Sequence, residues 1–512
     1  MKAINKVGVL TLLSFFTTTT QAQKERPNIL LFMVDDMGWQ DTSVPFHTQK
    51  TELNYRYNTP NMEQLANMGT KFTQAYASSV SSPSRCSLLT GVNMARHRVT
   101  NWTHIKDTPT DEFHETLNPP QWNVNGIQPV DGIPHSFPAT SFVQILSDNG
   151  YNTIHCGKAH FGATDTPSAN PLNYGFNINI AGHAAGGLAS YLGINRFGHN
   201  KEGEAISRFS VPQMEEYWDK EIFLTEALTQ EAIKTLDKAL DSESPFFLYM
   251  SHYAVHVPLE SDNRFIDKYL QKGLPPSEAA YASMIEGVDK SLGDLMQFLK
   301  KKGELENTII IFMSDNGGYS LQGRTPPYHT HNKPLRSGKG SAYEGGIREP
   351  MIVYWNGTAK PNSTIDEYVI IEDIFPTILE IADIKEYTTI QRVDGESLVP
   401  LIKGKKAKFT GRPLIWNMPN IWIAGDNREY GIGASCTIRK GDYKLIYWYE
   451  DGKKELYNIK NDISEQENLA EKLPHITKRL SKLLSKRLRK AKAQRPTYKD
   501  TGEYYLWPDG KI

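Results

Sequence analysis

The chain has 512 residues, of which 39% are hydrophobic and 22% are charged. This composition excludes an intrinsically disordered chain, and the length exceeds that of one ordinary core, so a large domain with a smaller second one is expected. The formal net charge of −1 creates no overall field that would attract a polyanion, so we expect no nucleic-acid partner and only local anion sites.

The first 22 residues have the order that is typical of a secretory signal peptide. Lys2 and Lys6 precede an apolar run over residues 7–16, which is too short to span a bilayer as a helix, and the small Ala22 suits a cleavage site. We therefore expect an exported protein of a Gram-negative-type bacterium, periplasmic or secreted to the cell surface, without stable membrane insertion. A buried N-terminal helix is the alternative.

Three apolar runs of strand length predict strands that are buried on both faces of a parallel sheet. They cover residues 28–34, 245–250 and 308–313. Thr59 and Pro60 suit the N-cap and the first position of a helix that runs to Met68 and is closed by Gly69. Residues 220–240 and 278–299 have the apolar spacing of helices that would cover the sheet.

The pattern changes at about residue 405 to short strand candidates and a final helix. Residues 439–449 and 455–459 predict two strands joined across Asp451-Gly452, and residues 474–493 predict a helix whose leucines form one stripe. We interpret its basic side as the solvated face of a packing helix; a membrane-surface or nucleic-acid helix is the alternative. The predicted units are a signal peptide (1–22), a catalytic domain (23–404) and a C-terminal subdomain (405–512).

The cysteine content excludes a disulfide framework. Cys86, Cys156 and Cys436 allow at most one disulfide bond, and their apolar or small neighbours favour buried structural thiols.

Two of the predicted strands end at acidic or amide side chains. Asp35 and Asp36 follow the first strand, and Asp315 and Asn316 follow the strand at 308–313. Because ligands collect beyond the carboxyl ends of strands in open α/β sheets, these residues point to one shared site. All four offer hard oxygen ligands, which suit Ca²⁺ or Mg²⁺ better than zinc. A helix cap or a solvated turn is the alternative for each acidic pair.

Residues 81–91 contain Ser81-Ser82-Pro83-Ser84-Arg85 and end in Thr90-Gly91. This stretch resembles the signature of type I, formylglycine-dependent sulfatases, which runs Cys/Ser-x-Pro-Ser-Arg and ends in Thr-Gly. The resemblance continues over about residues 27–469, at Gly157-Lys158-Ala159-His160 and at residues 253–258, 336–340, 344–348, 394–401, 444–445, 455–457 and 467–469. It implies an α/β, alkaline-phosphatase-like sandwich with a large mixed, mostly parallel sheet flanked by helices, plus a smaller C-terminal α+β subdomain with an antiparallel sheet.

The resemblance also implies roles for individual residues. Ser81 would be oxidised to formylglycine, whose hydrate is the nucleophile, and a calcium ion, with Mg²⁺ less favoured, would be bound by Asp35, Asp36, Ser81, Asp315 and Asn316. Arg85 would brace the formylglycine and the carboxylates. Lys158 and Lys339 would contact the sulfate oxygens. His256 would protonate the leaving oxygen and His160 would hold a formylglycine hydroxyl, although these two roles could be exchanged.

The resemblance implies an exported sulfatase that removes sulfate from carbohydrates. Serine at position 81 resembles bacterial serine-type enzymes that a radical-SAM maturase modifies, so that maturase is an expected partner. His183 is a candidate sugar contact, with a solvent-exposed loop histidine as the alternative. Two other functions stay open: a phosphomonoester or phosphonate hydrolase of the same superfamily, and a sulfoglycan-binding protein in which Ser81 stays serine.

Overall fold

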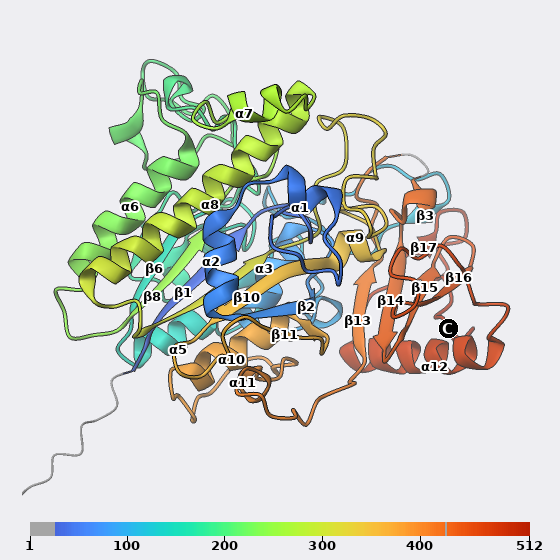
Figure 1. The fold of residues 1–512 in the computed structure, drawn as a ribbon. Helices are drawn as coiled ribbons and strands as arrows, with labels where there is room; N and C mark the ends of the chain where they lie inside the picture. Colours follow the sequence, from blue (N-terminus) through green and yellow to red (C-terminus); the bar gives the residue numbers. More distant parts are fainter. Residues whose placement is uncertain (1–25, 425–426) are drawn as a thin grey trace, which may run out of the picture.

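A computed structural model describes residues 26–424 and 427–512 of the chain (Figure 1). The expected signal peptide at 1–22 lies outside the described residues. A large sheet forms the centre of the molecule. In spatial order its strands are β11 (Ser363–Ile365), β2 (Thr70–Tyr76), β10 (Arg348–Tyr354), β9 (Thr308–Ser314), β1 (Asn28–Val34), β8 (Phe246–Ser251), β6 (Asn152–Gly157) and β7 (Ile178–Ile180), with β12 (Val369–Ile370) beside β2.

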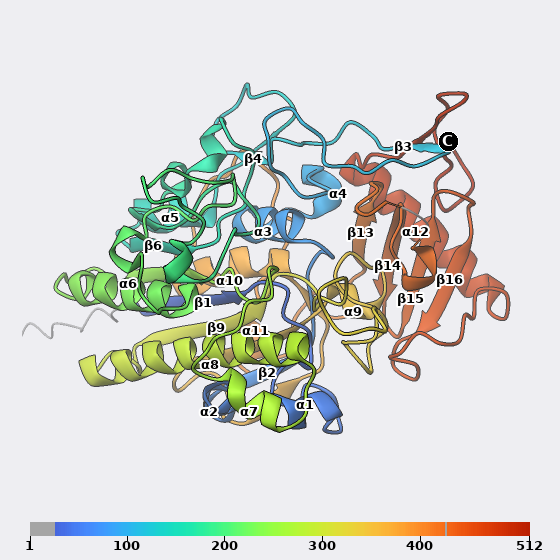
Figure 2. The ribbon, with the colours of Figure 1, turned by 90° about the horizontal axis from the view of Figure 1, so that it is seen from above.

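The large sheet is mixed and mostly parallel. β10 runs antiparallel to its neighbours β2 and β9, whereas the remaining pairs are parallel. Helices cover both faces (Figures 1 and 2). The α-helices in the described part of the chain, including α12, which lies against the smaller sheet, are α1 (Glu52–Arg56), α2 (Pro60–Met68), α3 (Ser81–Thr90), α4 (Met94–His97), α5 (Phe142–Asp148), α6 (Leu224–Ala239), α7 (Ile266–Gln271), α8 (Pro276–Lys302), α9 (Glu344–Ile347), α10 (Ile374–Ile381), α11 (Val399–Ile402) and α12 (Pro474–Ala491). The expected alkaline-phosphatase-like arrangement is confirmed.

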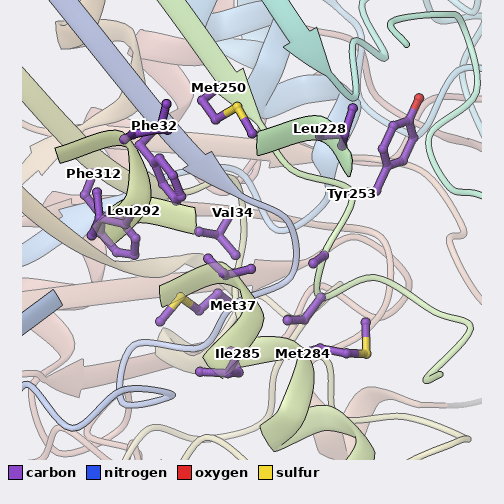
Figure 3. Close-up of a cluster of buried hydrophobic side chains, with 14 of the residues drawn as sticks. Phe32, Val34, Met37, Leu228, Met250, Tyr253, Met284, Ile285, Leu292 and Phe312 are labelled. Atoms are coloured by element: carbon purple, nitrogen blue, oxygen red, sulfur yellow. The ribbon is translucent and has the colours of Figure 1, made fainter. Parts of the chain in front are cut away.

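Strand β1 separates two hydrophobic cores, since successive side chains of a strand point to opposite faces. Leu30 and Phe32 enter a cluster with α2, α6 and α8, part of which is seen in Figure 3. Ile29 and Leu31 enter a second cluster with α3, α5 and α10. All seven residues of β1 are buried, which explains why the strand is a continuous apolar run in the sequence.

The strands predicted from apolar runs are confirmed to within one residue at each end, and α2 has the predicted bounds. Helices α6 and α8 confirm the two predicted covering helices with shifted ends. Thr59 precedes α2 as expected, but its side chain does not cap the helix. Its hydroxyl instead lies 2.8 Å from the Thr42 hydroxyl and accepts a hydrogen bond from the Ser43 amide at 2.8 Å.

The C-terminal part contains a separate antiparallel sheet at one side of the large sheet (Figure 1). Its strands are β13 (Leu414–Met418), β14 (Ser435–Lys440), β15 (Tyr443–Trp448) and β16 (Lys454–Asn458). The prediction of one strand over 439–449 was wrong, because the chain turns at Gly441, whose φ is 61°, between β14 and β15. The hairpin across Asp451-Gly452 is confirmed as the β15–β16 pair.

Helix α12 packs against this smaller sheet. Leu480, Leu484 and Leu488 are buried in one cluster with Ile438 of β14 and Leu445 of β15. The leucine stripe of α12 therefore contributes to a core, as expected for a packing helix. The predicted boundary between residues 404 and 405 stays a prediction.

Buried charges join the smaller sheet to the large one. Glu344 of α9 lies 3.1 Å from Lys444 Nζ of β15 and 3.2 Å from Arg348 of β10, and it accepts a hydrogen bond from the Tyr76 hydroxyl of β2 at 2.7 Å. Lys444 also pairs with Glu465 at 2.9 Å. These groups are buried, so each charge has lost its hydration. Its ion pairs and hydrogen bonds must compensate for that loss.

Two further expectations concern thiols and the membrane. Cys86, Cys156 and Cys436 are buried free thiols, which confirms the structural interpretation. Among the helices in residues 26–424 and 427–512, none combines the length and the apolar character that a membrane crossing requires.

Candidate active site

Four neighbouring parallel strands end at the site and deliver most of its side chains. β1 leads into Asp35 and Asp36, and β9 ends one residue before Asp315. Lys158 directly follows β6, and the segment after β8 leads to His256. Because the strands β9, β1, β8 and β6 lie side by side in this order, residues that are distant in the sequence meet at one edge of the sheet.

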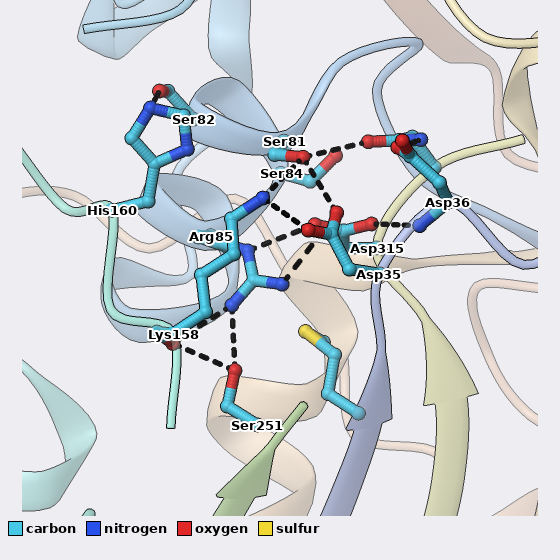
Figure 4. A network of polar contacts seen from close by, with 12 residues as sticks. Asp35, Asp36, Ser81, Ser82, Ser84, Arg85, Lys158, His160, Ser251 and Asp315 are labelled. Carbon is cyan, nitrogen blue, oxygen red and sulfur yellow. Dashed lines mark hydrogen bonds and ion pairs between the residues drawn. The ribbon is translucent and has the colours of Figure 1, made fainter. Parts of the chain in front are cut away.

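Three fully buried carboxylates form the centre of the site (Figure 4). Asp35, Asp36 and Asp315 each offer an oxygen within 4.8 Å of the others. Asn316 Nδ2 donates a hydrogen bond to Asp36 Oδ1 at 2.8 Å, so its Oδ1 remains available as a further ligand. The site predicted from the two strand ends is therefore a single cluster.

Ser81 is the first residue of α3 and touches this cluster. Its Oγ lies 3.1 Å from Asp35 Oδ1 and 3.0 Å from Asn316 Oδ1, and Lys158 Nζ donates to it at 3.1 Å. The free amides at a helix N-terminus favour negative charge beside them. The hydroxyl thus sits where a helix end, an ammonium group and oxygen ligands meet.

Arg85 lies one turn after Ser81, on the same face of α3. Its Nε donates to Asp315 Oδ2 at 2.8 Å, and its Nη1 donates to the Lys158 carbonyl at 3.0 Å and to Ser251 Oγ at 2.6 Å. Burial disfavours the charged guanidinium, but Asp315, Tyr249 and Asp35 together outweigh burial and raise the pKa of Arg85. Arg85 is therefore a permanent cation that fixes α3 to β9, β6 and β8.

The two lysines each hold one carboxylate. Lys158 Nζ lies 2.5 Å from Asp35 Oδ2, and Lys339 Nζ lies 2.8 Å from Asp36 Oδ2. Burial lowers the pKa of Lys158 even though Asp35 opposes it. Burial acts in the same direction on Lys339, but Asp36 and Asp35 outweigh it and raise its pKa. Both ammonium groups would be available to an anion once a cation takes over the carboxylates.

His256 is partly open to solvent, with 19% of its side chain exposed. Its Nδ1 lies 2.8 Å from the Val257 carbonyl, which can only accept, so Nδ1 carries the proton and donates. The other nitrogen, Nε2, is then free to take up or release a proton, and it lies 3.8 Å from Asp36 Oδ2. Burial and then Lys339 lower the pKa of His256.

His160 is more deeply buried. Its Nε2 lies 3.0 Å from the Thr103 carbonyl and 2.8 Å from Ser82 Oγ, so Nε2 carries the proton and donates to the carbonyl. Its Nδ1 finds no hydrogen-bond partner among the described residues. Burial, with Lys158 and Arg85, lowers its pKa well below the ordinary value, which leaves Nδ1 as a neutral acceptor.

Several residues that contact His160, Arg85 and His256 were not predicted from the sequence. Ser82 and Ser251 fix His160 and Arg85 respectively. A Cβ added to Gly186 would lie 2.1 Å from His160 Cε1, and one added to Gly187 would lie 3.2 Å from His256 Cε1. The glycine-rich stretch 182–187 is visible in the sequence, and its glycines indicate close approach of the backbone to other groups. Only the fold shows that these groups are His160 and His256.

His183, the predicted sugar contact, is half buried on the same glycine-rich stretch. Its carbonyl accepts a hydrogen bond from the His160 amide at 3.3 Å, and its ring Nε2 is buried without a partner among the described residues. Burial lowers the pKa of His183 to about 4. The ring is therefore neutral and lies near the site.

The donor set fits a hard divalent cation. Asp35, Asp36 and Asp315 are held close enough to repel one another, and all the available ligand atoms, including Asn316 Oδ1 and Ser81 Oγ, are oxygens. A thiolate or imidazole ligand of the kind that zinc prefers is absent from this described cluster.

Comparison with known proteins decides the family. A sequence profile described as Sulfatase matches residues 27–384, and one described as N-sulphoglucosamine sulphohydrolase, C-terminal, matches residues 338–494. The chain belongs to the sulfatase family. It is a sulfuric ester hydrolase, and the cluster around Ser81 is its candidate active site.

Relatives of this sulfatase cover nearly the whole chain. A sulfatase of Formosa agariphila is 29% identical over 93% of this chain and 90% of its own length. N-acetylgalactosamine-6-sulfatase of Mus musculus is 28% identical over 86% of this chain and 75% of its own. The structure of Ps i-CgsB in complex with k-i-k-neocarrahexaose matches with a TM-score of 0.71 and 26% identity, covering 90% and 93% of the two chains.

The phosphonate monoester hydrolase of Agrobacterium radiobacter shares the fold, with a TM-score of 0.58 and 20% identity over 91% of this chain and 95% of its own. At 20% identity this likeness shows a shared fold, and the reaction has to be argued from the residues of the site.

Proposed function

We propose that this sulfatase is an exported enzyme that removes sulfate from carbohydrates, with a formylglycine made from Ser81 as nucleophile and a calcium ion at Asp35, Asp36, Asp315 and Asn316. The observation that carries the proposal is the position of Ser81. Its Oγ lies within 3.1 Å of a carboxylate, an amide oxygen and an ammonium group, at the N-terminus of a buried helix. An unmodified serine is a weak nucleophile, and no histidine base contacts its Oγ among the described residues.

The residues around Ser81 match the needs of sulfate-ester hydrolysis. The tetrahedral anion resists attack by an anionic nucleophile, so its oxygens must be neutralised and its leaving oxygen protonated. Lys158 and Lys339 would bind the sulfate oxygens from either side of the carboxylates. His256, whose Nε2 is free and reaches solvent, would give its proton to the leaving sugar oxygen. His160 Nδ1 would accept a hydrogen bond from a hydroxyl of the modified residue 81.

Calcium, when bound, would supply two positive charges that polarise a ligating oxygen and offset the three carboxylates. Arg85 would keep Asp315 and the start of α3 in place for it. Replacement of calcium by magnesium is less favoured, because a cluster with three carboxylates, an amide and a residue-81 oxygen offers more ligands than magnesium usually takes from a protein.

The carbohydrate substrate is supported by the relatives. One is named for N-acetylgalactosamine 6-sulfate and one holds an oligosaccharide in its crystal structure. Serine at position 81 supports a radical-SAM maturase as partner, and the N-terminal sequence supports export to the periplasm or cell surface.

Mass spectrometry of the peptide that contains Ser81, with sulfate release measured beside it, tests the proposal. Protein made with the maturase should carry formylglycine at position 81 and release sulfate from at least one sugar sulfate. Ser81→Ala should lower kcat by about 10³-fold or more, because the nucleophile is lost. The matched control is Ser87→Ala, on the same helix but bonded to His97.

Chelation followed by repletion tests the metal. Calcium should restore sulfate release better than magnesium does. A clear preference for the matching phosphate ester would instead indicate a phosphomonoester or phosphonate hydrolase, and an unmodified Ser81 in the native host with binding but no turnover would indicate a sulfoglycan-binding protein.

A further inference from the structure

Three side chains form a wall of rings beside the two catalytic histidines. The rings of Trp102 and His104 lie 5.7 Å apart with an interplanar angle of 33°, and those of His104 and Phe209 lie 4.9 Å apart at 29°. We call Trp102, His104 and Phe209 the ring wall. Trp102 and Phe209 are half buried, so the wall keeps surface that a ligand can contact.

The ring wall is tied to the site by backbone contacts. His160 Nε2 donates to the carbonyl of Thr103, the residue between Trp102 and His104, at 3.0 Å. The Ala189 amide donates to the Phe209 carbonyl at 2.8 Å. A Cβ placed on Gly187 would lie 3.2 Å from the His256 ring and 3.8 Å from the Phe209 ring. Phe209 therefore lies next to the histidine that faces the leaving group.

Two imidazole nitrogens at this wall lack partners. The Nε2 atoms of His104 and His183 are buried and have no hydrogen-bond partner within the described part of the chain. An unsatisfied buried nitrogen is unfavourable, and a polar ligand group that bonds to it removes this penalty. Burial lowers the pKa of both rings, and His104 lowers the pKa of His183 further, so both act as neutral hydrogen-bonding groups.

Arg208 adds a positive charge beside the ring wall. It immediately precedes Phe209, is exposed, and makes no ion pair or side-chain hydrogen bond with another described residue. Its charge reaches the wall, because after burial Arg208 is the group that lowers the pKa of His104. A guanidinium group matches the oxygens of a sulfate ester or a carboxylate in two-pronged geometry.

We propose that Trp102, His104, His183, Phe209 and Arg208 form the sugar subsite of this enzyme, and that Arg208 binds a second anionic group of the saccharide besides the sulfate that is removed. The rings contact the sugar face, the two imidazoles bond its hydroxyls, and the exposed guanidinium pairs with a further sulfate or a carboxylate. The substrate class is thus a saccharide with at least two anionic groups. This inference rests on the proposed carbohydrate substrate.

Calorimetric binding to protein made without the maturase tests the subsite apart from catalysis, because Ser81 then stays serine. The probes are galactose 4-sulfate, galactose 6-sulfate, galactose 4,6-disulfate, and a disaccharide of glucuronic acid with one sulfated sugar. The wild-type protein should bind a doubly anionic probe about fivefold or more tightly than either monosulfate. Preference for the disulfate or for the glucuronic acid probe identifies which oxyanion Arg208 takes.

Variants assign the effect to Arg208. Arg208→Gln should weaken binding of the preferred doubly anionic probe about 5- to 10-fold and change monosulfate binding less than twofold. Lys201→Gln removes an exposed charge from the same segment and should leave both affinities within twofold. His104→Ala should weaken all bound probes, because it opens the ring wall.

Equal affinity of the wild-type protein for singly and doubly anionic probes, equal effects of Arg208→Gln and Lys201→Gln, or no binding of any probe would each overturn the inference. Sulfate release by the matured enzyme is scored separately. If it is absent while Arg208-dependent binding persists, the proposed hydrolysis fails and the subsite stands.

Discussion

At the scale of single residues, His256 combines exposure with a free nitrogen. Its Nδ1 donates to the Val257 carbonyl, so Nε2 alone can exchange a proton with a substrate. We expect His256→Gln to lower kcat for a sugar sulfate about 10²- to 10⁴-fold, since the sugar oxygen is a poor leaving group without a proton. With nitrophenyl sulfate, whose leaving group is far more acidic, the loss should shrink to about tenfold or less.

The matched control is His135→Gln, an exposed histidine paired with Asp107 away from the site. It should leave both rates unchanged. Equal losses on the two substrates for His256→Gln would show that this histidine acts in binding or positioning and that the proton comes from another group.

Glu372 provides a pH-dependent prediction away from the active site. Burial raises its pKa from 4.5 to about 8, although Asn93 opposes this with a hydrogen bond of 2.5 Å. The folded state therefore holds the proton more tightly than the unfolded state. This contribution to stability is fully present below pH 4.5 and is lost as the pH rises to about 8.

Glu372→Gln keeps the shape of the protonated acid and cannot ionise. We expect its free energy of unfolding to match the wild type near pH 4.5 and to exceed it by about 2–5 kcal/mol above pH 8, in urea unfolding at several pH values. A difference that stays constant across this range would contradict a raised pKa.

At the scale of elements, the backbone of segment 182–187 closely approaches the rings of His160 and His256. A methyl group on Gly186 would lie 2.1 Å from His160 Cε1 and 2.5 Å from each ring nitrogen, so the ring must move. We expect Gly186→Ala to lower kcat/KM by about 10²-fold, since small displacements of positioned groups are costly. Steady-state kinetics with a sugar sulfate measure this.

Gly150→Ala is the control, because its Cβ would meet nothing within 4 Å while its φ of 86° still disfavours alanine. It should cost about 1 kcal/mol of stability and keep full activity. If both variants lost activity in proportion to stability, the contact with His160 would not matter to catalysis.

Features that depend on local sequence could be predicted, whereas contacts between segments far apart in the sequence could not. Strand β1 could be predicted, because a strand that is buried on both faces consists of a continuous apolar run. The residues after it could be predicted too, because Asp35 and Asp36 end that run. Helix α3 was not predicted as a helix, since its ten residues are all buried and contain four serines and a proline, which hide the usual periodicity. The contacts of Gly186 and Ser251 join distant segments and leave no local pattern.

At the scale of the whole molecule, the buried charges around Glu344 connect the two sheets. Lys444 pairs with both Glu344 and Glu465 in the interior. Lys444→Met should lower the free energy of unfolding by about 3–5 kcal/mol, because two buried carboxylates lose their shared partner. The surface pair of Lys453 with Asp451 gives the control, and Lys453→Met should cost less than about 1 kcal/mol.

Because the network spans β2, α9, β10 and β15, we expect activity and circular dichroism to be lost in one unfolding transition, which shifts to lower urea in Lys444→Met. Separate transitions, with the activity of Lys444→Met retained after its smaller sheet unfolds, would show that the two sheets are energetically independent.

The burial of Ser81 affects the stage of folding at which its side chain is most accessible to a modifying enzyme. Ser81 is only 3% exposed, and α3 is enclosed by the large sheet, α5 and α10. Strand β17 (Thr497–Tyr498) pairs with β3 (Leu117–Asn118), so this contact joins two segments that are far apart in the sequence. If Ser81 is oxidised as proposed, a modifying enzyme reaches its side chain more easily in the unfolded chain than in the folded one, so we expect a slowly folding variant to be modified more completely than a fast one.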